Sequence, residues 1–220
     1  MQEASIEAVV GPMFAGKTTT LISRAEKYSN EAIVFKPSFD TRYALTDIKS
    51  HNGKVFQAVS ASSVQDLSVP ENIKTVIIDE VQFFTEPYFK GNIINAIMDL
   101  KRRGITVICA GLDKNWQGQD FDITSKVINI ADRITILKAK CAVCGEPAGY
   151  SFKKSGSDAE IELGAADIYE PRCHKHFYNF TQYVGDLRCI DAKKLFSNNA
   201  LLESIFGLPP ANENNHLDNA

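Results

Sequence analysis

The sequence has no apolar run long enough to cross a membrane and no basic, apolar start of the kind that opens a signal peptide. It also has no excess of positive charge, because 24 Lys and Arg stand against 27 Asp and Glu, for a net charge of −3. This balance argues against a protein that coats nucleic acid or an anionic membrane, so we expect neither partner. We expect a cytoplasmic protein whose five cysteines serve as metal ligands or core residues rather than disulfides.

What the sequence does have is the composition of an ordinary globular protein, with 44% hydrophobic and 23% charged residues. Short apolar runs that predict strands lie at residues 6–10, 32–35 (ended by Lys36-Pro37), 75–78 and 105–110. Stretches of helical composition lie at residues 17–28 and 87–103, residues 125–130 form a helix or strand, and residues 133–137 form a last strand. Apolar strands that alternate with helices favour an α/β fold, a parallel sheet flanked by helices.

The predicted α/β core of the P-loop NTPase type covers residues 1–138. From residue 140 to about residue 178, cysteines, glycines and charges replace the apolar runs, which favours a small zinc-binding domain at residues 139–190. Residues 191–220 form a C-terminal tail, with a short helix predicted within 190–206. Its polar end, residues 209–220, contains four asparagines and is expected to be disordered.

Residues 11–18, Gly-Pro-Met-Phe-Ala-Gly-Lys-Thr, match the phosphate-loop pattern G-x-x-x-x-G-K-[ST]. In such a loop the backbone N–H groups and the following helix N-terminus surround the phosphates. Lys17 is expected to reach the β- and γ-phosphates, and the Thr18 hydroxyl to ligate Mg²⁺. The alternative is a glycine-rich turn that carries a lysine by chance. The position between a predicted strand and a predicted helix favours a nucleoside triphosphate site.

Two consecutive carboxylates, Asp79 and Glu80, end the apolar run at residues 75–78. Because successive strand side chains point to opposite faces, one acid can serve Mg²⁺ while the other faces a second substrate. Transfer of a phosphoryl group to an alcohol needs a carboxylate that accepts the hydroxyl proton. We expect the metal role for Asp79 and the base role for Glu80. The alternative is that both acids merely end the strand in solvent.

Four residues have the types and local spacing of structural zinc ligands: Cys141 and Cys144, then Cys173 and His176, with 28 residues between the two pairs. The set is closed and offers no open position for water, so its role is predicted to be structural. The alternative, two redox cysteine pairs, is disfavoured because a histidine completes the second pair.

Three nearby residues are interpreted differently. His174 is a weaker ligand candidate than His176, which keeps the C-x₂-H spacing. Cys109 lies within an apolar run and is expected in the core. Cys189 has no partner in the sequence and receives no role.

These features, in this order, resemble the type II thymidine kinases over residues 6–178. The segments that carry the resemblance are residues 11–18, Asp40-Thr-Arg-Tyr43, Asp79-Glu-Val-Gln-Phe-Phe84, Gly111-Leu-Asp, the two zinc half-sites and Ala166-Asp-Ile-Tyr169. The resemblance implies transfer of the γ-phosphate of ATP to the 5′-hydroxyl of thymidine, and of deoxyuridine, to give dTMP in DNA precursor salvage. It also implies a homotetramer that dTTP inhibits.

The resemblance also implies residue roles, with Glu80 as the general base. ATP and Mg²⁺ are expected to bind Gly11, Pro12, Met13, Phe14, Ala15, Gly16, Lys17, Thr18, Arg42, Asp79 and Gln82. Thymidine is expected to bind Met13, Phe83, Leu112, Trp116, Phe121, Gly164 and Tyr169. A lasso loop at residues 149–169, tied at its base by zinc, closes over the nucleoside in this family. Without the resemblance, Arg42 would be interpreted as a surface charge, and Phe83, Trp116 and Phe121 equally as core residues.

The sequence departs from the family pattern at two places. Glu162-Leu163-Gly164-Ala165 replaces a smaller, more glycine-rich stretch, which affects the base contacts of the lasso. Trp116 stands where a phenylalanine is more usual, which can tighten the pocket. Neither change touches the chemistry.

Three other protein classes share some of these features. An adenylate kinase with a zinc-bearing lid carries that lid in mid-chain, whereas this metal module follows the core. An ATP-driven nucleic-acid-binding protein with a zinc ribbon needs a basic patch with interleaved aromatic residues, which the sequence lacks. A non-catalytic nucleotide switch needs neither the paired acids nor a closing loop. The sequence therefore favours the nucleoside kinase.

Overall fold

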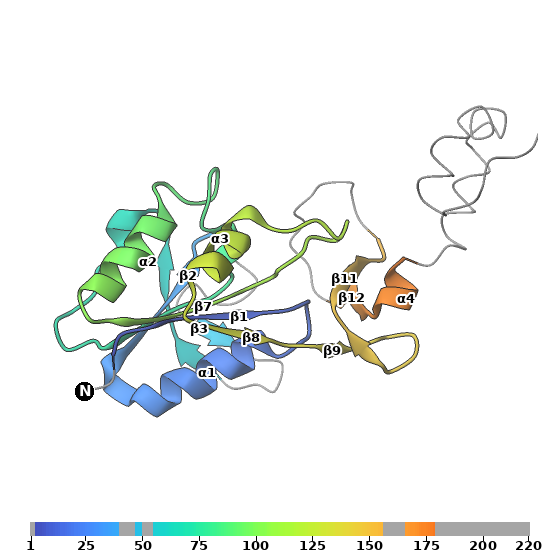
Figure 1. The fold of residues 1–220 in the computed structure, drawn as a ribbon, viewed down its shortest axis with the longest axis horizontal. Coiled ribbons are helices and arrows are strands. Elements are labelled where there is room, and N and C mark those ends of the chain that lie inside the picture. The colour runs from blue at the N-terminus through green and yellow to red at the C-terminus, as the bar shows by residue number, and fades with distance from the viewer. Residues whose placement is uncertain (1–2, 40–46, 50–54, 156–165, 179–220) are drawn as a thin grey trace, which may run out of the picture. The chain divides into compact units, whose positions relative to one another are not determined.

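The computed structural model describes residues 3–39, 47–49, 55–155 and 166–178 (Figure 1). The described residues up to Phe177 form one compact unit. The boundaries at residues 138 and 190 stay predictions. The helix predicted within 190–206, the disorder predicted for 209–220 and Cys189 lie outside the described residues.

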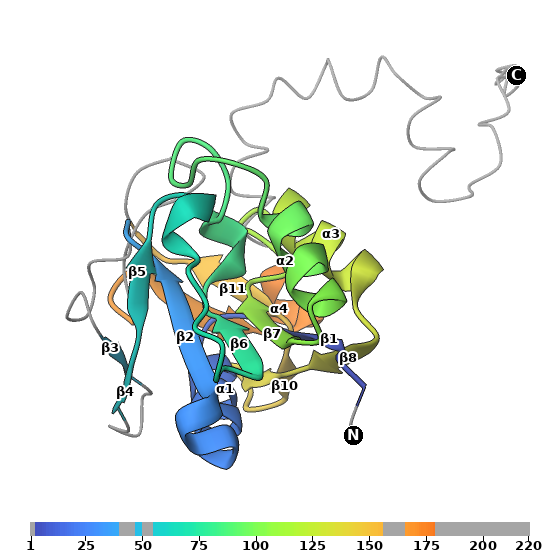
Figure 2. The same ribbon diagram turned by 90° about the vertical axis from the view of Figure 1, so that its left-hand side faces the viewer.

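Six strands form one parallel sheet in the order β5-β2-β6-β7-β1-β8 (Figure 2). They are β1 (Ile6–Val10), β2 (Ala32–Pro37), β5 (Val59–Ala61), β6 (Thr75–Ile78), β7 (Thr106–Gly111) and β8 (Arg133–Ile136). The predicted α/β fold with a parallel sheet is confirmed. Because β7 lies between β1 and β6, the loops that follow these three strands leave the same edge of the sheet side by side.

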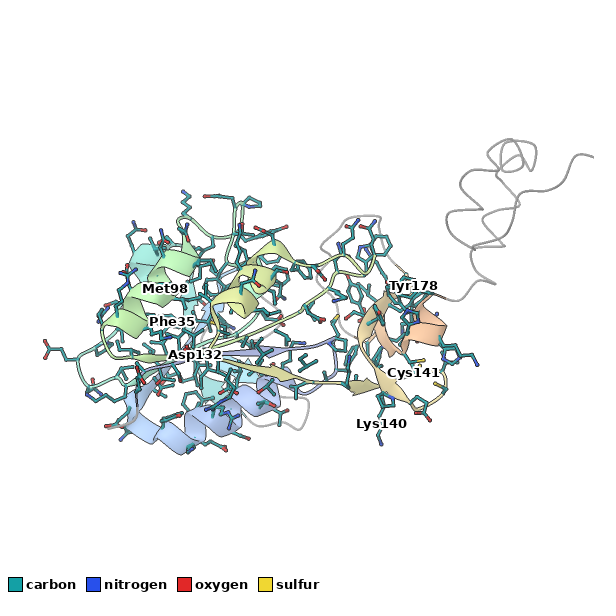
Figure 3. The ribbon with its side chains drawn as sticks, viewed as in Figure 1. Phe35, Met98, Asp132, Lys140, Cys141 and Tyr178 are labelled. Atoms are coloured by element: carbon teal, nitrogen blue, oxygen red, sulfur yellow. The ribbon has the colours of Figure 1, made fainter. Side chains whose placement is uncertain are left out.

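Helices cover both faces of this sheet, α1 (Lys17–Tyr28) on one face, α2 (Ile93–Arg102) and α3 (Asp122–Ile130) on the other (Figure 1). Alternate residues along the strands supply the two cores. The residues that pack with Leu21, Ile22 and Ala25 of α1 are Val9, Val34, Ile77, Ile108 and Ala110. Those that pack with α2 and α3 include Ala8, Val10, Phe35, Val76, Ile78, Val107 and Cys109, which confirms the core position of Cys109. Figure 3 shows Phe35 on the side of the sheet where Met98 of α2 lies.

Smaller elements complete the described chain. A two-stranded hairpin is formed by β3 (Asp47–Lys49) and β4 (Val55–Gln57), and short 3₁₀ turns lie at η1 (Ser29–Glu31), η2 (Val64–Asp66) and η3 (Val81–Phe83). The cysteine-rich region forms two further antiparallel pairs, β9 (Ala139–Lys140) with β10 (Pro147–Ala148) and β11 (Tyr150–Lys153) with β12 (Tyr169–Arg172), followed by α4 (His174–Phe177). None of the helices in these described ranges is both long and apolar enough to cross a membrane.

The predicted start of one helix is wrong. The helix predicted from residue 87 begins only at Ile93, because the Asn92 side chain accepts a hydrogen bond from the Asn95 N–H at 3.0 Å and caps the helix there. Strand β2 ends at Pro37, as the sequence predicted, and its register with β5 pairs Pro37 with Ala61. The segment predicted as helix or strand at 125–130 belongs to α3, which begins three residues earlier.

Replacing Asn92 with alanine removes the cap of α2 and is expected to lower the free energy of unfolding by about 1 kcal/mol. Asn92→Asp keeps an oxygen acceptor at the same position and is expected to stay close to the parent protein. Urea unfolding of the three proteins measures the difference. Equal stability of Asn92→Ala and the parent would contradict the capping role.

Candidate active site and metal centre

The phosphate loop connects β1 to α1, and both of its glycines have positive φ angles. Gly11 has φ 152° and Gly16 φ 84°. A Cβ on Gly11 would lie 2.4 Å from the carbonyl oxygen of Leu137, so only glycine fits where the loop passes the end of β8. The buried ammonium of Lys17 donates hydrogen bonds to the carbonyl oxygens of Gly11 at 3.1 Å and Pro12 at 2.8 Å. The loop therefore holds its lysine over its own turn, the place where phosphates bind such loops.

The two acids lie just beyond β6, which ends at Ile78. Asp79 is buried, and its carboxylate accepts hydrogen bonds from the Thr18 hydroxyl at 3.4 Å and from the Glu80 N–H at 2.9 Å. Glu80 has φ 52° and ψ 45°, a left-handed conformation that non-glycine residues rarely adopt. The prediction assumed that the two acids point to opposite faces because they continue the strand. In the structure both lie beyond the end of β6, and the left-handed turn at Glu80 sets their directions.

Gln82 connects Glu80 to the end of β7. Its side chain is almost fully buried, and its amide nitrogen donates to the Glu80 carboxylate at 2.6 Å, a short charge-assisted bond. Its amide oxygen accepts the N–H of Leu112 at 3.0 Å. A Cβ on Gly111 would lie 2.6 Å from that same oxygen, so the glycine makes room for Gln82. The resemblance implied ATP contacts for Gln82, whereas its hydrogen bonds in the structure go to Glu80 and Leu112.

Six residues expected around the nucleoside fall within the described ranges: Met13, Phe83, Leu112, Trp116, Phe121 and Tyr169. Met13, Phe83 and Leu112 follow β1, β6 and β7, so they share the carboxyl edge of the sheet. Phe83 and Tyr169 are buried and the other four are half-buried. Arg42, Gly164 and the segments 40–43 and 162–165 lie outside the described residues.

A hydrogen-bonded loop between β7 and α3 carries Trp116. The buried Asn115 accepts the N–H groups of Gln117 and Gln119 through its side-chain oxygen, each at 3.0 Å. Lys114 pairs with Asp113 at 3.3 Å and with Asp120 at 3.0 Å. Desolvation alone would lower the pKa of Lys114, but the hydrogen bond to Asp120 and the charge of Asp113 raise it above its ordinary value. Hydrogen bonds and ion pairs therefore hold the residues on both sides of Trp116 in the sequence.

Sequence reasoning missed several residues beside this edge. The Phe39 ring packs against Tyr88 in a tilted arrangement with ring centroids 4.1 Å apart, and it makes an edge-to-face contact with Phe83 at a centroid distance of 5.4 Å. The Lys153 ammonium lies 5.2 Å from the centre of the Trp116 ring. An aromatic residue two positions after the end of a strand was a usable signal for Phe39. Nothing in the sequence pointed to Lys153.

The structure brings together Cys141, Cys144, Cys173 and His176, whose ligand atoms all lie within 4.8 Å of one another. The Cys173 sulfur is 3.3 Å and the Cys141 sulfur 3.6 Å from Nδ1 of His176, and the Cys144 and Cys173 sulfurs are 3.8 Å apart. Cys141 and Cys144 lie on the turn between β9 and β10, where Figure 3 labels Cys141. His174 is not part of this cluster.

The surroundings favour the thiolate at Cys141, whereas at Cys144 a lowering backbone hydrogen bond with Glu146 is outweighed by desolvation and by the neighbouring Cys141 and Cys173, which raise the pKa. Desolvation would by itself raise the pKa of Cys141, but hydrogen bonds from the backbone of Cys173, Cys144 and Val143 outweigh it and lower the pKa to about 6. A tetrahedral metal with sulfur ligands at about 2.3 Å and nitrogen ligands at about 2.0 Å needs ligand atoms about 3.5–3.8 Å apart. The observed separations are close to these, so the donor set fits a tetrahedral ion.

Comparisons with known proteins agree with this geometry. A family profile described as thymidine kinase matches residues 4–177. A thymidine kinase of Bdellovibrio bacteriovorus is 39% identical over 178 residues, which cover 78% of this chain and 84% of that protein. Among solved structures, the Pif1 helicase from Bacteroides in complex with ADP-AlF3 and ssDNA shares 22% identity over 50% of this chain and 28% of its own. Its TM-score of 0.27 is too low to bear on the fold. On the strength of the profile match and the 39% identity, the chain belongs to the thymidine kinase family.

Proposed function

We propose that this protein transfers the γ-phosphate of ATP to the 5′-hydroxyl of thymidine, and of deoxyuridine, and so forms dTMP for DNA synthesis. The observation that carries the proposal is the Glu80 carboxylate, fixed by Gln82 beside an aspartate that meets the phosphate loop. Family membership supports thymidine as the acceptor and disfavours an adenylate kinase, a zinc-ribbon protein and a non-catalytic switch.

In this proposal the phosphate loop and Lys17 position ATP. Backbone N–H groups of the loop and the N-terminus of α1 bind the phosphate oxygens, and the Lys17 charge stabilises the γ-phosphoryl group as it leaves. Thr18 and Asp79 offer hard oxygen ligands that face each other at 3.4 Å, which fits a magnesium ion held directly or through water. That ion, when bound, neutralises charge on the phosphates.

Glu80 is the proposed general base. A thymidine held between the loops after β1, β6 and β7 presents its 5′-hydroxyl to this carboxylate, which takes the proton as the new O–P bond forms and the bond between the γ-phosphorus and the leaving ADP breaks. Gln82 holds one carboxylate oxygen at 2.6 Å, so the base keeps one orientation through the transfer. Met13, Phe83, Leu112, Trp116, Phe121 and Tyr169 are the proposed lining for the flat base and its sugar.

We further propose that the ion of the metal centre is zinc, held by Cys141, Cys144, Cys173 and His176 in a structural role. Three thiolates with one imidazole form a closed set of the kind that structural zinc prefers. A cytoplasmic location is part of the proposal, since cysteine ligands stay reduced in the cytosol and ATP is available there. The homotetramer, inhibition by dTTP, and the roles of Arg42 and Gly164 stay predictions from the resemblance.

The base role is tested by Glu80→Gln, which keeps the shape of the side chain but cannot accept the proton. We expect kcat to fall by on the order of 10²–10⁴ while KM for thymidine changes little. Asp79→Asn is the comparison variant, and its defect is expected to be partly relieved by raising Mg²⁺. Steady-state kinetics across a Mg²⁺ series separate the two. Near-normal kcat in Glu80→Gln, or rescue of that variant by Mg²⁺, would show that the roles are misassigned.

The positioning role of Gln82 is tested by Gln82→Met, which keeps the length of the side chain but removes both hydrogen bonds. We expect kcat to fall by about tenfold with KM for ATP and thymidine nearly unchanged, because the loss of about 1–2 kcal/mol falls on the orientation of the base. Gln65→Met, at an exposed site in η2, is the matched control. If KM for ATP rises instead and kcat is kept, the role of Gln82 is to contact ATP and not to orient the Glu80 carboxylate.

The metal assignment predicts one zinc per chain in protein purified without chelators. His176→Ala is expected to lose the metal, because it opens the four-ligand set, whereas His174→Ala in the same helix is expected to keep it. Metal analysis by mass spectrometry measures both variants. Parent protein without zinc, or equal zinc in both variants, would refute the assignment.

A further inference from the structure

The phosphate loop is tied to the cysteine-rich region by a hydrogen bond between residues 138 positions apart in the sequence. The N–H of Met13 donates to the hydroxyl of Ser151 at 3.0 Å. Ser151 lies on β11 and is 3% exposed, so this hydrogen bond is shielded from solvent on the Ser151 side. Its strand pairs with β12, in which Pro171 faces Ser151 and which leads directly to the ligand Cys173. The register of this hairpin therefore links the position of the hydroxyl to the metal centre.

A second contact joins the same two regions. Phe14 and Ala15 of the phosphate loop pack into one apolar cluster with Ala139, Ala148 and the metal ligands Cys141 and Cys173. Phe14 has φ 64°, a left-handed conformation that is strained for a residue other than glycine and that persists only where surrounding structure holds it. The apolar cluster supplies that support, because the phenyl ring and the metal-ligand turn pack together. The loop thus depends on the metal region both for a hydrogen bond and for its backbone conformation.

A phosphate loop binds well only when its N–H groups already surround the space for the phosphates. A loop that visits this arrangement only part of the time binds with an affinity reduced by that fraction. The Met13 N–H is occupied by Ser151, so this bond fixes the middle of the loop and leaves phosphate binding to the other donors of the turn.

We propose that the metal-bound region holds the phosphate loop in its nucleotide-binding conformation, with Ser151 as the positioning residue that acts through the Met13 backbone. The inference rests on the proposed function, in that the loop is taken to bind ATP. It assigns to the metal region a role toward ATP, in addition to the role as the base of the lasso loop that the resemblance implies. Ser151 belongs to none of the motifs that the sequence offers.

The first test is ATP affinity without thymidine, measured by calorimetry on full-length, zinc-loaded protein. Ser151→Ala leaves the Met13 N–H unpaired and is expected to raise the ATP dissociation constant by about 3- to 10-fold. Ser151→Thr keeps the hydroxyl and is expected to restore most of the affinity. Ser68→Ala, at an exposed site, is the matched control. Unchanged affinity in Ser151→Ala, or equal losses in the Ala and Thr variants, would overturn the role of the hydroxyl.

The second test removes zinc from the parent protein with a graded chelator series while zinc content, far-ultraviolet circular dichroism and ATP affinity are followed. We expect ATP affinity to fall in step with zinc content while the helical signal of the core is kept. Zinc-free protein that keeps its helical signal and full ATP affinity would overturn the proposal. Parent protein that binds ATP but does not phosphorylate thymidine would refute the proposed function and leave this inference standing, so the two failures are distinguishable.

Discussion

The constraint on which the rest of the structure depends is the order of three parallel strands, β6-β7-β1, in the central sheet. This order makes the carboxyl ends of the three strands neighbours, so the phosphate loop, the paired acids and the Gly111 turn emerge side by side. The Thr18–Asp79 and Gln82–Leu112 hydrogen bonds are consequences of this arrangement. Both faces of the sheet at these strands are apolar, and each face is covered by its own helices.

Around this edge, each reactive group is held by a neighbour on another element. Lys17 is held by carbonyls of its own loop, Asp79 faces Thr18, and Glu80 is fixed by Gln82. The left-handed residues Phe14 and Glu80 both lie in this region, one in each of the two segments that meet there. Such conformations persist where packing and hydrogen bonds over-determine them. For Phe14 the packing comes from the cysteine-rich region, so the conformation of the phosphate loop depends on the region that carries the four candidate metal ligands.

The features that the sequence predicted correctly are those that depend on local patterns of residues. The phosphate loop, the acids after β6 and the four metal ligands each follow from residue types at fixed spacing, and the strands follow from short apolar runs. The start of α2 was missed because a single asparagine cap, and not the helical composition of the preceding residues, decides it. The turn at Glu80 was missed because non-glycine residues rarely adopt the left-handed conformation, and no local pattern in the sequence indicates it here. The Met13–Ser151 bond joins residues 138 positions apart, and no periodicity or motif encodes such a pair.

The central claim is that this site phosphorylates the 5′-hydroxyl of a pyrimidine deoxynucleoside. The most direct measurement is transfer of radiolabelled γ-phosphate from ATP to a panel of nucleosides and nucleoside monophosphates, with the labelled products separated and identified. The account predicts labelled dTMP from thymidine, labelled dUMP from deoxyuridine and no labelled diphosphate from any monophosphate. Phosphorylation of a monophosphate in preference to thymidine, or hydrolysis of ATP without any labelled nucleotide product, would contradict it.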